Sequence, residues 1–128
     1  MAKRTTAKKA DDIAFRSGCP IASTLDLVGD RWSLVIVRDM LTGKAKFGDF
    51  LASPEQVPTN ILTARLKRME QSGLVAKQAY QSNPTRFEYR LTEKGAALLP
   101  VLQDICRWAN VYIPGTWTPP ASIMARKR

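Results

Sequence analysis

The sequence predicts a mainly helical α+β domain, in which four helical segments are followed by a two-stranded hairpin and a long final helix. Two observations support this prediction. Apolar residues recur at helical spacing up to residue 72, whereas residues 86–91 alternate strictly between polar and apolar side chains. Turn-forming residues separate the segments. At 128 residues the chain is long enough for one such domain with its own core.

Three helices are predicted in the first part of the chain. Residues 19–28 carry apolar side chains at helical spacing and end at Gly29, a residue type that often follows a helix. Asp30 can cap a second helix over residues 31–41, because its carboxylate can accept the free N–H groups of the first turn. A short third helix over residues 47–51 turns two phenylalanines and a leucine inward.

A fourth helix is predicted after the turn at residues 53–58, which is rich in helix-breaking residues. Pro58 suits the first position of a helix over residues 59–72. Gly73 is well placed as the left-handed residue that ends it.

A hairpin and a last helix complete the domain. Residues 74–80 and 86–91 are predicted to pair as strands, with turn formers at 81–85 between them. Thr92 can cap the final helix, and Pro100 is expected to kink it or to begin a second segment. This order of elements is the outline of a winged helix-turn-helix domain, with the hairpin as the wing.

The predicted fourth helix has two distinct faces when its residues are projected at about 100° each. Leu62, Leu66 and Met69 fall on one side, flanked by Ile61 and Arg65. Opposite them lie Asn60, Ala64, Lys67 and Gln71, flanked by Thr63 and Arg68. The candidate DNA contacts of this helix are Thr59 at its start, Asn60, Thr63, Ala64, Lys67 and Arg68. Asparagine and threonine can read bases in a major groove, a small alanine permits close approach, and basic side chains can reach phosphates. The alternative is an ordinary amphipathic helix with a solvated polar face.

Further candidate DNA contacts lie outside this helix. Asn83, Thr85 and Arg86 are at or beside the tip of the hairpin, where Arg86 could contact phosphate or enter the minor groove. Arg86 could instead pair across the strand or stay solvated. Lys44 and Lys46 precede the third helix and either contact the DNA backbone or are simply exposed turn lysines.

The charge of the chain is concentrated at its ends. The sequence has 20 Lys and Arg residues against 11 Asp and Glu, a net charge of +9. Residues 11–125 hold 13 of the basic and all 11 of the acidic groups, so the interior is nearly neutral. We expect a flexible basic arm at residues 1–12 and an irregular basic tail at 114–128. One interpretation is that these ends are simply solvated tails on a nearly neutral domain. The other is that their positive charge strengthens the attraction of the chain to a polyanion.

The composition excludes several kinds of site. The chain has no histidine, which removes the usual zinc sites and both Ser–His and Cys–His catalysis. No glycine-rich phosphate loop occurs, because Gly43-Lys44 lacks the preceding spacing of a P-loop. We therefore expect no enzyme activity, no metal and no cofactor. The chain has neither a signal peptide nor an apolar run long enough to span a bilayer, so a cytoplasmic location is expected.

Several short motifs follow one another along residues 18–109. The first are Cys19-Pro20 and Leu25-Asp26-Leu27-Val28-Gly29-Asp30-Arg31-Trp32, and others lie at residues 38–39, 47–50, 58–70, 73–75, 89–95 and 98–102. Their combination resembles the HxlR family of bacterial winged-helix regulators. The resemblance implies a homodimer that binds pseudo-palindromic DNA. It also implies one domain at residues 13–113, whose terminal helices, including a C-terminal dimerisation helix, form the dimer interface.

The same resemblance implies that the helix beginning near Thr59 is the recognition helix. Pro58 departs from the serine that is frequent there in relatives, so the first-turn DNA contact must come from Thr59 or Asn60. The basic arm and the proline-rich tail lie outside the family pattern.

The two cysteines, Cys19 and Cys106, have different expected roles. Some members of the family sense oxidants or electrophiles through the cysteine that matches Cys19. A position near a helix N-terminus favours the reactive thiolate, and Arg16 and Arg31 are candidate positive neighbours. The alternative for Cys19 is a small buried residue at the dimer contact. Cys106 has apolar helical neighbours and is predicted to belong to the core.

We therefore predict a sequence-specific, DNA-binding transcriptional regulator that acts as a homodimer on a pseudo-palindromic operator, with Cys19 as its candidate redox-sensing residue. The alternative is a winged-helix module for non-specific DNA binding or for protein binding. The expected partners are double-stranded DNA and a second copy of the chain, without a membrane. The sequence does not identify a small-molecule effector.

Overall fold

The computed structural model describes residues 13–127. The arm predicted at residues 1–12 lies outside the described residues. The elements are, in chain order, α1 (Pro20–Val28), α2 (Ser33–Leu41), α3 (Phe47–Leu51), α4 (Thr59–Gln71), β1 (Val75–Gln81), β2 (Arg86–Leu91), α5 (Glu93–Ala96), α6 (Leu99–Tyr112) and α7 (Ala121–Met124). This order confirms the predicted mainly helical α+β class.

The core lies where α2, α3 and α4 meet the base of the hairpin. Its largest fully buried side chains come from these three helices: Ile36, Val37, Phe50, Leu62, Leu66 and Met69. The ring of Tyr89 from β2 packs edge-on against Phe50, with ring centroids 6.4 Å apart. Burial of this aliphatic and aromatic surface is the main force that holds α4 against the domain.

The second helix begins two residues later than its predicted start, but Asp30 still caps it. The Oδ2 atom of Asp30 accepts the backbone N–H groups of Trp32 and Ser33 at 2.9 and 3.0 Å. The Ser33 hydroxyl donates to the other carboxylate oxygen. Because these N–H groups at the start of α2 have no carbonyl partner within the helix, the Asp30 carboxylate supplies the missing hydrogen-bond acceptors.

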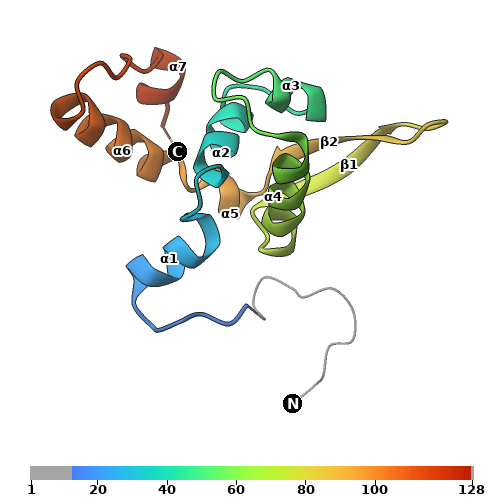
Figure 1. Ribbon diagram of the computed structural model, residues 1–128, viewed down its shortest axis with the longest axis horizontal. Helices are drawn as coiled ribbons and strands as arrows, with labels where there is room; N and C mark the ends of the chain where they lie inside the picture. Colours follow the sequence, from blue (N-terminus) through green and yellow to red (C-terminus); the bar gives the residue numbers. More distant parts are fainter. Residues whose placement is uncertain (1–12, 128) are drawn as a thin grey trace.

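The predicted end of α4 is confirmed at Gly73, whose φ is +82°. The backbone N–H of Leu74 donates to the carbonyl of Met69 at 2.9 Å, which closes the helix and turns the chain into β1. β1 and β2 then pair antiparallel, with Val75 opposite Leu91 and an irregularity between Ala79 and Gln81. Figure 1 shows this hairpin extending away from the helices as a wing.

The predicted final helix is divided into α5 and α6, so Pro100 begins a second segment, which is one of the two outcomes expected for it. The Thr92 hydroxyl accepts the N–H of Gly95 at 3.1 Å and caps the single turn of α5. α6 then begins at Leu99, with Pro100 in its first turn. A proline is tolerated there because the first N–H groups of a helix have no intrahelical partner.

The tail predicted to be irregular contains one helical turn, α7, and is fixed to the domain. Ile123 is buried, and the Gln103 side chain donates to the carbonyls of Ile123 and Arg126 at 2.8 and 2.9 Å. The Arg126 guanidinium donates to the carbonyl of Leu41 at 2.6 Å. In Figure 1 the segment after α6 curves back toward α2. No helix within residues 13–127 is long and apolar enough to cross a membrane.

Candidate DNA interface

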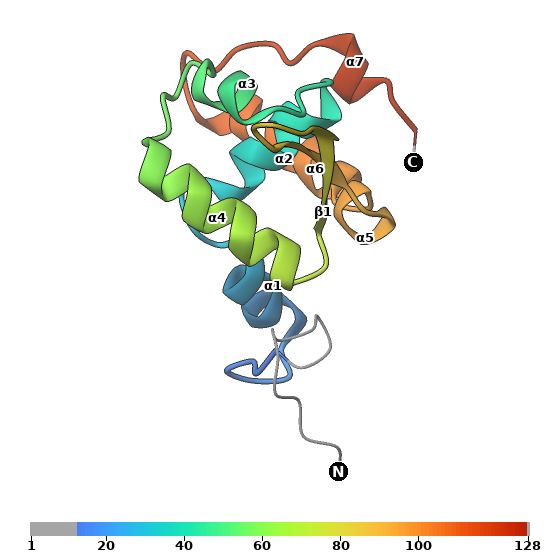
Figure 2. The same cartoon turned by 90° about the vertical axis from the view of Figure 1, so that its right-hand side faces the viewer.

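The fourth helix divides into a buried and an exposed face as the sequence predicts. Leu62, Leu66 and Met69 are at most 2% exposed, while Ile61 and Arg65 are half-buried at the flanks. All six predicted DNA-contact residues of the helix are exposed: Thr59, Asn60, Thr63, Ala64, Lys67 and Arg68. Figure 2 shows α4 along one side of the domain, with the hairpin seen nearly end-on beside the helices.

Two arginines attach α4 to the elements that precede it. The Nε atom of Arg65 donates to Asp30 Oδ2 at 3.0 Å, so the cap of α2 also holds the middle of α4. The Arg68 guanidinium donates to the backbone carbonyl of Asp26 in α1. Burial disfavours ionisation of Asp30, but the hydrogen bonds from Ser33 and the backbone, with the charge of Arg65, lower its pKa below the ordinary value.

The first turns of α4 present groups that suit a DNA groove. The Thr63 hydroxyl donates to the carbonyl of Thr59 at 3.0 Å, which leaves its oxygen lone pairs free to accept and its methyl group exposed. Asn60 carries both a donor and an acceptor, and it is exposed one residue into the helix. These are the groups that read adenine and thymine edges in a major groove.

The wing places its predicted residues at the far end of the hairpin. Asn83, Thr85 and Arg86 are all exposed, and Asn83 adopts a left-handed φ of 57° in the turn. The alternative in which Arg86 pairs across the strand is not found among the described residues, where Arg90 pairs with Glu88 instead. The Arg86 side chain therefore lies on the surface of the wing.

The two lysines before α3 differ from each other. Lys46 is exposed, and its amine lies 4.5 Å from the centroid of the Tyr80 ring in the wing. The backbone beside it also joins the hairpin, because the Tyr89 N–H donates to the carbonyl of Ala45 at 2.7 Å. Lys44 is half-buried and its amine donates to the Ser53 hydroxyl at 3.0 Å. The DNA contact of Lys44 stays a prediction, and its amine already has the Ser53 hydroxyl as a partner within the chain.

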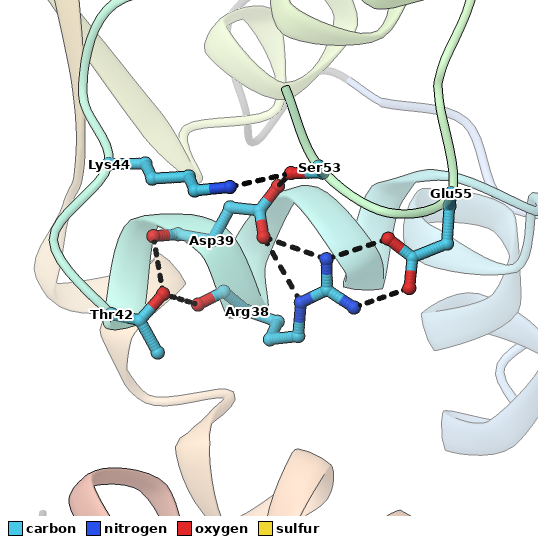
Figure 3. Close-up of polar contacts among 6 residues, drawn as sticks. All are labelled: Arg38, Asp39, Thr42, Lys44, Ser53 and Glu55. Carbon is cyan, nitrogen blue, oxygen red and sulfur yellow. Dashed lines mark hydrogen bonds and ion pairs between the residues drawn. The ribbon is translucent and has the colours of Figure 1, made fainter. Parts of the chain in front are cut away.

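A polar network joins α2 to the turn before α4, and sequence reasoning did not find it (Figure 3). The Arg38 guanidinium donates to both carboxylate oxygens of Glu55 at 2.7 and 2.8 Å, and to Asp39 at 2.8 and 3.1 Å. The Ser53 hydroxyl donates to Asp39 as well. The hydrogen bonds that Arg38 donates to Glu55 hold the pKa of Glu55 below its ordinary value, and the same bonds raise the pKa of Arg38.

The cysteines are both free, and their surroundings differ from the expectation. Cys19 is exposed and directly precedes α1, so it is not buried within this chain. Arg16, expected as a positive neighbour, instead donates to Asp26 at 2.6 Å and to the carbonyl of Ala22. Cys106, expected in the core, is only half-buried.

A broad apolar surface is exposed on the two terminal helices. α6 exposes Trp108, Val111 and Tyr112 by 61–72%, and the rings of Trp108 and Tyr112 lie 5.4 Å apart. On α1, Ile21 and Leu25 are 72% and 53% exposed. Large apolar side chains exposed together on one helix, as on α6, are typical of an interface with another protein chain.

Comparison with known proteins gives a family model and several relatives. The model described as HxlR-like helix-turn-helix matches residues 27–116. The HTH-type transcriptional regulator Mb3122 of Mycobacterium bovis is 35% identical over 113 residues, which cover 88% of this chain and 71% of the relative.

Two solved structures are also similar. PA1607, a transcription factor, superposes with a TM-score of 0.71 at 38% identity and covers 81% of this chain and 73% of its own. The redox regulator HypR in its oxidised form superposes with a TM-score of 0.66 at 31% identity and covers 73% of this chain and 96% of its own. These similarities confirm the predicted winged helix-turn-helix fold.

Proposed function

Because the chain belongs to the HxlR family of helix-turn-helix transcriptional regulators, we propose that it binds a pseudo-palindromic DNA operator as a homodimer. The relatives are transcriptional regulators and not enzymes, in agreement with the sequence prediction. The observation that carries the proposal is the exposed face of α4, which combines base-reading groups in its first turns with basic groups farther along.

Base recognition is assigned to the first two turns of α4. Asn60 and Thr63 would read base edges in the major groove, with Thr59 and Ala64 lining the approach. Lys67 and Arg68 would contact phosphates on one side, and Lys46 on the other, which fixes the register of the helix. Asn83, Thr85 and Arg86 of the wing would reach the neighbouring backbone or minor groove.

The test of this assignment begins with DNA fragments selected from the source genome by the purified protein. Substitution of Asn60 by Ala is then expected to cost about 1–3 kcal/mol of binding free energy and to relax sequence preference at one position in each half-site. Gln71→Ala, an exposed amide at the end of the same helix, is the matched control. An equal loss of affinity on all sequences would refute base reading by Asn60.

Phosphate contact by α4 has a separate signature in salt dependence. Neutralising Lys67 to Ala should reduce the slope of log affinity against log salt by about 1. If selection yields no preferred fragment and competitor DNA displaces the protein freely, the chain is a non-specific binding module instead.

The homodimer is proposed to form through the apolar surface of α6 and α1. Burying Trp108 and Val111, which are 61% and 72% exposed, against a second copy would remove their apolar surface from water. Two α4 helices related by a two-fold axis would then meet half-sites about 34–36 Å apart. Sedimentation should give a dimer at micromolar concentration, and Val111→Asp should shift it to monomer. A monomeric parent protein would refute this part.

A response to oxidants through Cys19 is a separable part of the proposal. Its support is the exposure of the Cys19 thiol at the start of α1 and the similarity to HypR, a redox regulator. An exposed thiol can be oxidised reversibly, and a change of charge or a new bond beside α1 would disturb the proposed dimer surface. Oxidant should then release the operator from the parent protein but not from Cys19→Ser. Equal release from both would refute a role for Cys19.

A further inference from the structure

A large cavity lies between α2, α6 and the tail, and no residue of α4 or of the hairpin lines it. Its volume is about 810 Å³. Leu34 and Val35 of α2 line one side, Leu102 and Ile105 of α6 line another, and the segment at residues 115–120 closes it. Pockets of roughly 300–1,000 Å³ with mainly apolar walls are the usual binding sites for small organic molecules.

The outer wall of the cavity is fixed in place by the chain itself. The Asn110 side chain donates to the Thr116 hydroxyl at 2.9 Å and to the carbonyl of Trp117 at 3.0 Å. Farther along, Gln103 holds the backbone around the buried Ile123. The family match ends at residue 116, so most of this wall lies beyond it. The cavity is therefore a feature of this chain's tail as much as of the family domain.

Each charged group that lines the cavity already has a hydrogen-bond partner within the chain. Figure 3 shows Arg38 held between Glu55 and Asp39, and the Lys44 amine on the Ser53 hydroxyl. Two cationic and two anionic side chains thus balance at this wall. Because the four charges sum to zero, this wall has no net charge to attract an ionic ligand, whereas its apolar surface favours an uncharged one. The indole of Trp117 and the neighbouring prolines offer flat apolar surfaces for a ring.

We propose that this cavity binds a small, uncharged, mainly apolar organic molecule, and that its occupancy acts on α4 through Pro54 and Glu55. Both residues line the cavity and belong to the turn that leads into α4. Glu55 is held by Arg38 of α2, so a ligand against this pair changes how α2 and the turn are joined. The proposed effect of the ligand on α4 rests on the proposed DNA-binding function, whereas the proposed ligand site in the cavity does not.

The binding site is tested on the full chain without DNA, with the uncharged fluorophore N-phenyl-1-naphthylamine as the probe. We expect saturable binding with enhanced fluorescence. Ile105→Ser should weaken it about tenfold, because apolar contact area at the cavity wall is lost. Val101→Ser is the matched control: Val101 and Ile105 are 40% and 47% exposed on the same helix, but Val101 does not line the cavity. No saturable binding, or an equal loss in both variants, would overturn the proposal.

A second readout places the probe in the cavity. Cys106 lines the cavity and is half-buried. Because the chain has two cysteines, Cys106 is the single remaining thiol in a Cys19→Ser variant. The probe should slow alkylation of Cys106 by N-ethylmaleimide severalfold at saturation. An unchanged alkylation rate would mean that the probe binds elsewhere, and it would overturn the assignment.

The coupling to α4 is tested by linkage. If occupancy acts on α4, saturating DNA must change the affinity for the probe, because coupling between two sites is reciprocal. We expect a change of at least about threefold with fragments selected by the protein, or with any duplex that it binds. Equal probe affinity with and without DNA would refute the coupling. If the chain binds no DNA, the coupling fails together with the proposed function, whereas the titration without DNA still decides the site.

Discussion

The stability of the domain should depend strongly on Asp30, a residue that the structure uses twice. Its carboxylate accepts three hydrogen bonds at the start of α2 and pairs with Arg65 of α4. Replacing Asp30 by Ala removes all of these contacts at once. The side chain of Asp30 is 17% exposed and that of Arg65 is 27% exposed, so water replaces the lost contacts only in part.

The magnitude follows from three contributions. Loss of a helix cap costs about 1 kcal/mol. Ser33 is 1% exposed, so its hydroxyl would be left buried without its acceptor, at a cost of about 1–3 kcal/mol. The half-buried pair with Arg65 adds about 0.5–1 kcal/mol. Since the three share one side chain and are not strictly additive, we expect a total loss of about 2–4 kcal/mol in the free energy of unfolding.

Urea denaturation at one fixed protein concentration measures this loss, because a dimer would make the midpoint depend on concentration. Asp30→Asn retains a capping oxygen but loses the charge, so it should lie between the parent and Asp30→Ala. Asp26→Asn is the control, since Asp26 also pairs with an arginine, Arg16, whose side chain is 65% exposed. A loss below about 0.5 kcal/mol for Asp30→Ala would refute the reasoning that a buried cap and ion pair join the two helices.

Three other predictions concern the core and the polar network. Leu62→Ala should reduce the free energy of unfolding by about 2–5 kcal/mol, since this side chain of α4 is fully buried, and urea denaturation should detect it. Gly95→Ala should cost about 1–3 kcal/mol by the same assay, because the added Cβ would strike the carbonyl oxygen of Leu74. Glu55 has a pKa lowered from its ordinary 4.5 by Arg38, so it stabilises the fold above that value and loses this effect as the pH falls further. Glu55→Gln should therefore be less stable than the parent at neutral pH, and the difference should shrink in acid titrations.

The sequence predicted the elements whose causes are local. The apolar spacing of Leu62, Leu66 and Met69 defines the buried face of α4 by itself, and the alternation over residues 86–91 defines β2. Gly73 was recognised as a helix end because only a few residues adopt its left-handed backbone readily. Such signals involve neighbours along the chain, and they carry over to the structure almost unchanged.

The polar contacts between elements were not predicted, because they depend on which distant residues meet. Asp30 and Arg65 are 35 residues apart, and Arg38 and Glu55 are 17 apart. Neither pair forms a local motif: the sequence indicates Asp30 as a helix cap and Arg65 at the flank of the apolar face, but not that the two meet. The docking of the tail is a similar case, because Ile123 stands in a short segment with little apolar periodicity.

These contacts decide which basic side chains contribute to the field at the proposed DNA interface. Arg65 and Arg38 face carboxylates, so their charges are largely cancelled before any DNA approaches. Arg68 donates to a backbone carbonyl, and no ion pair of Arg68 is found among the described residues. Lys67 is exposed beside it, and the described residues include no carboxylate within ion-pair distance of it. Phosphate attraction on α4 should therefore come from residues 67 and 68, while the inner arginines serve to hold the helix in place.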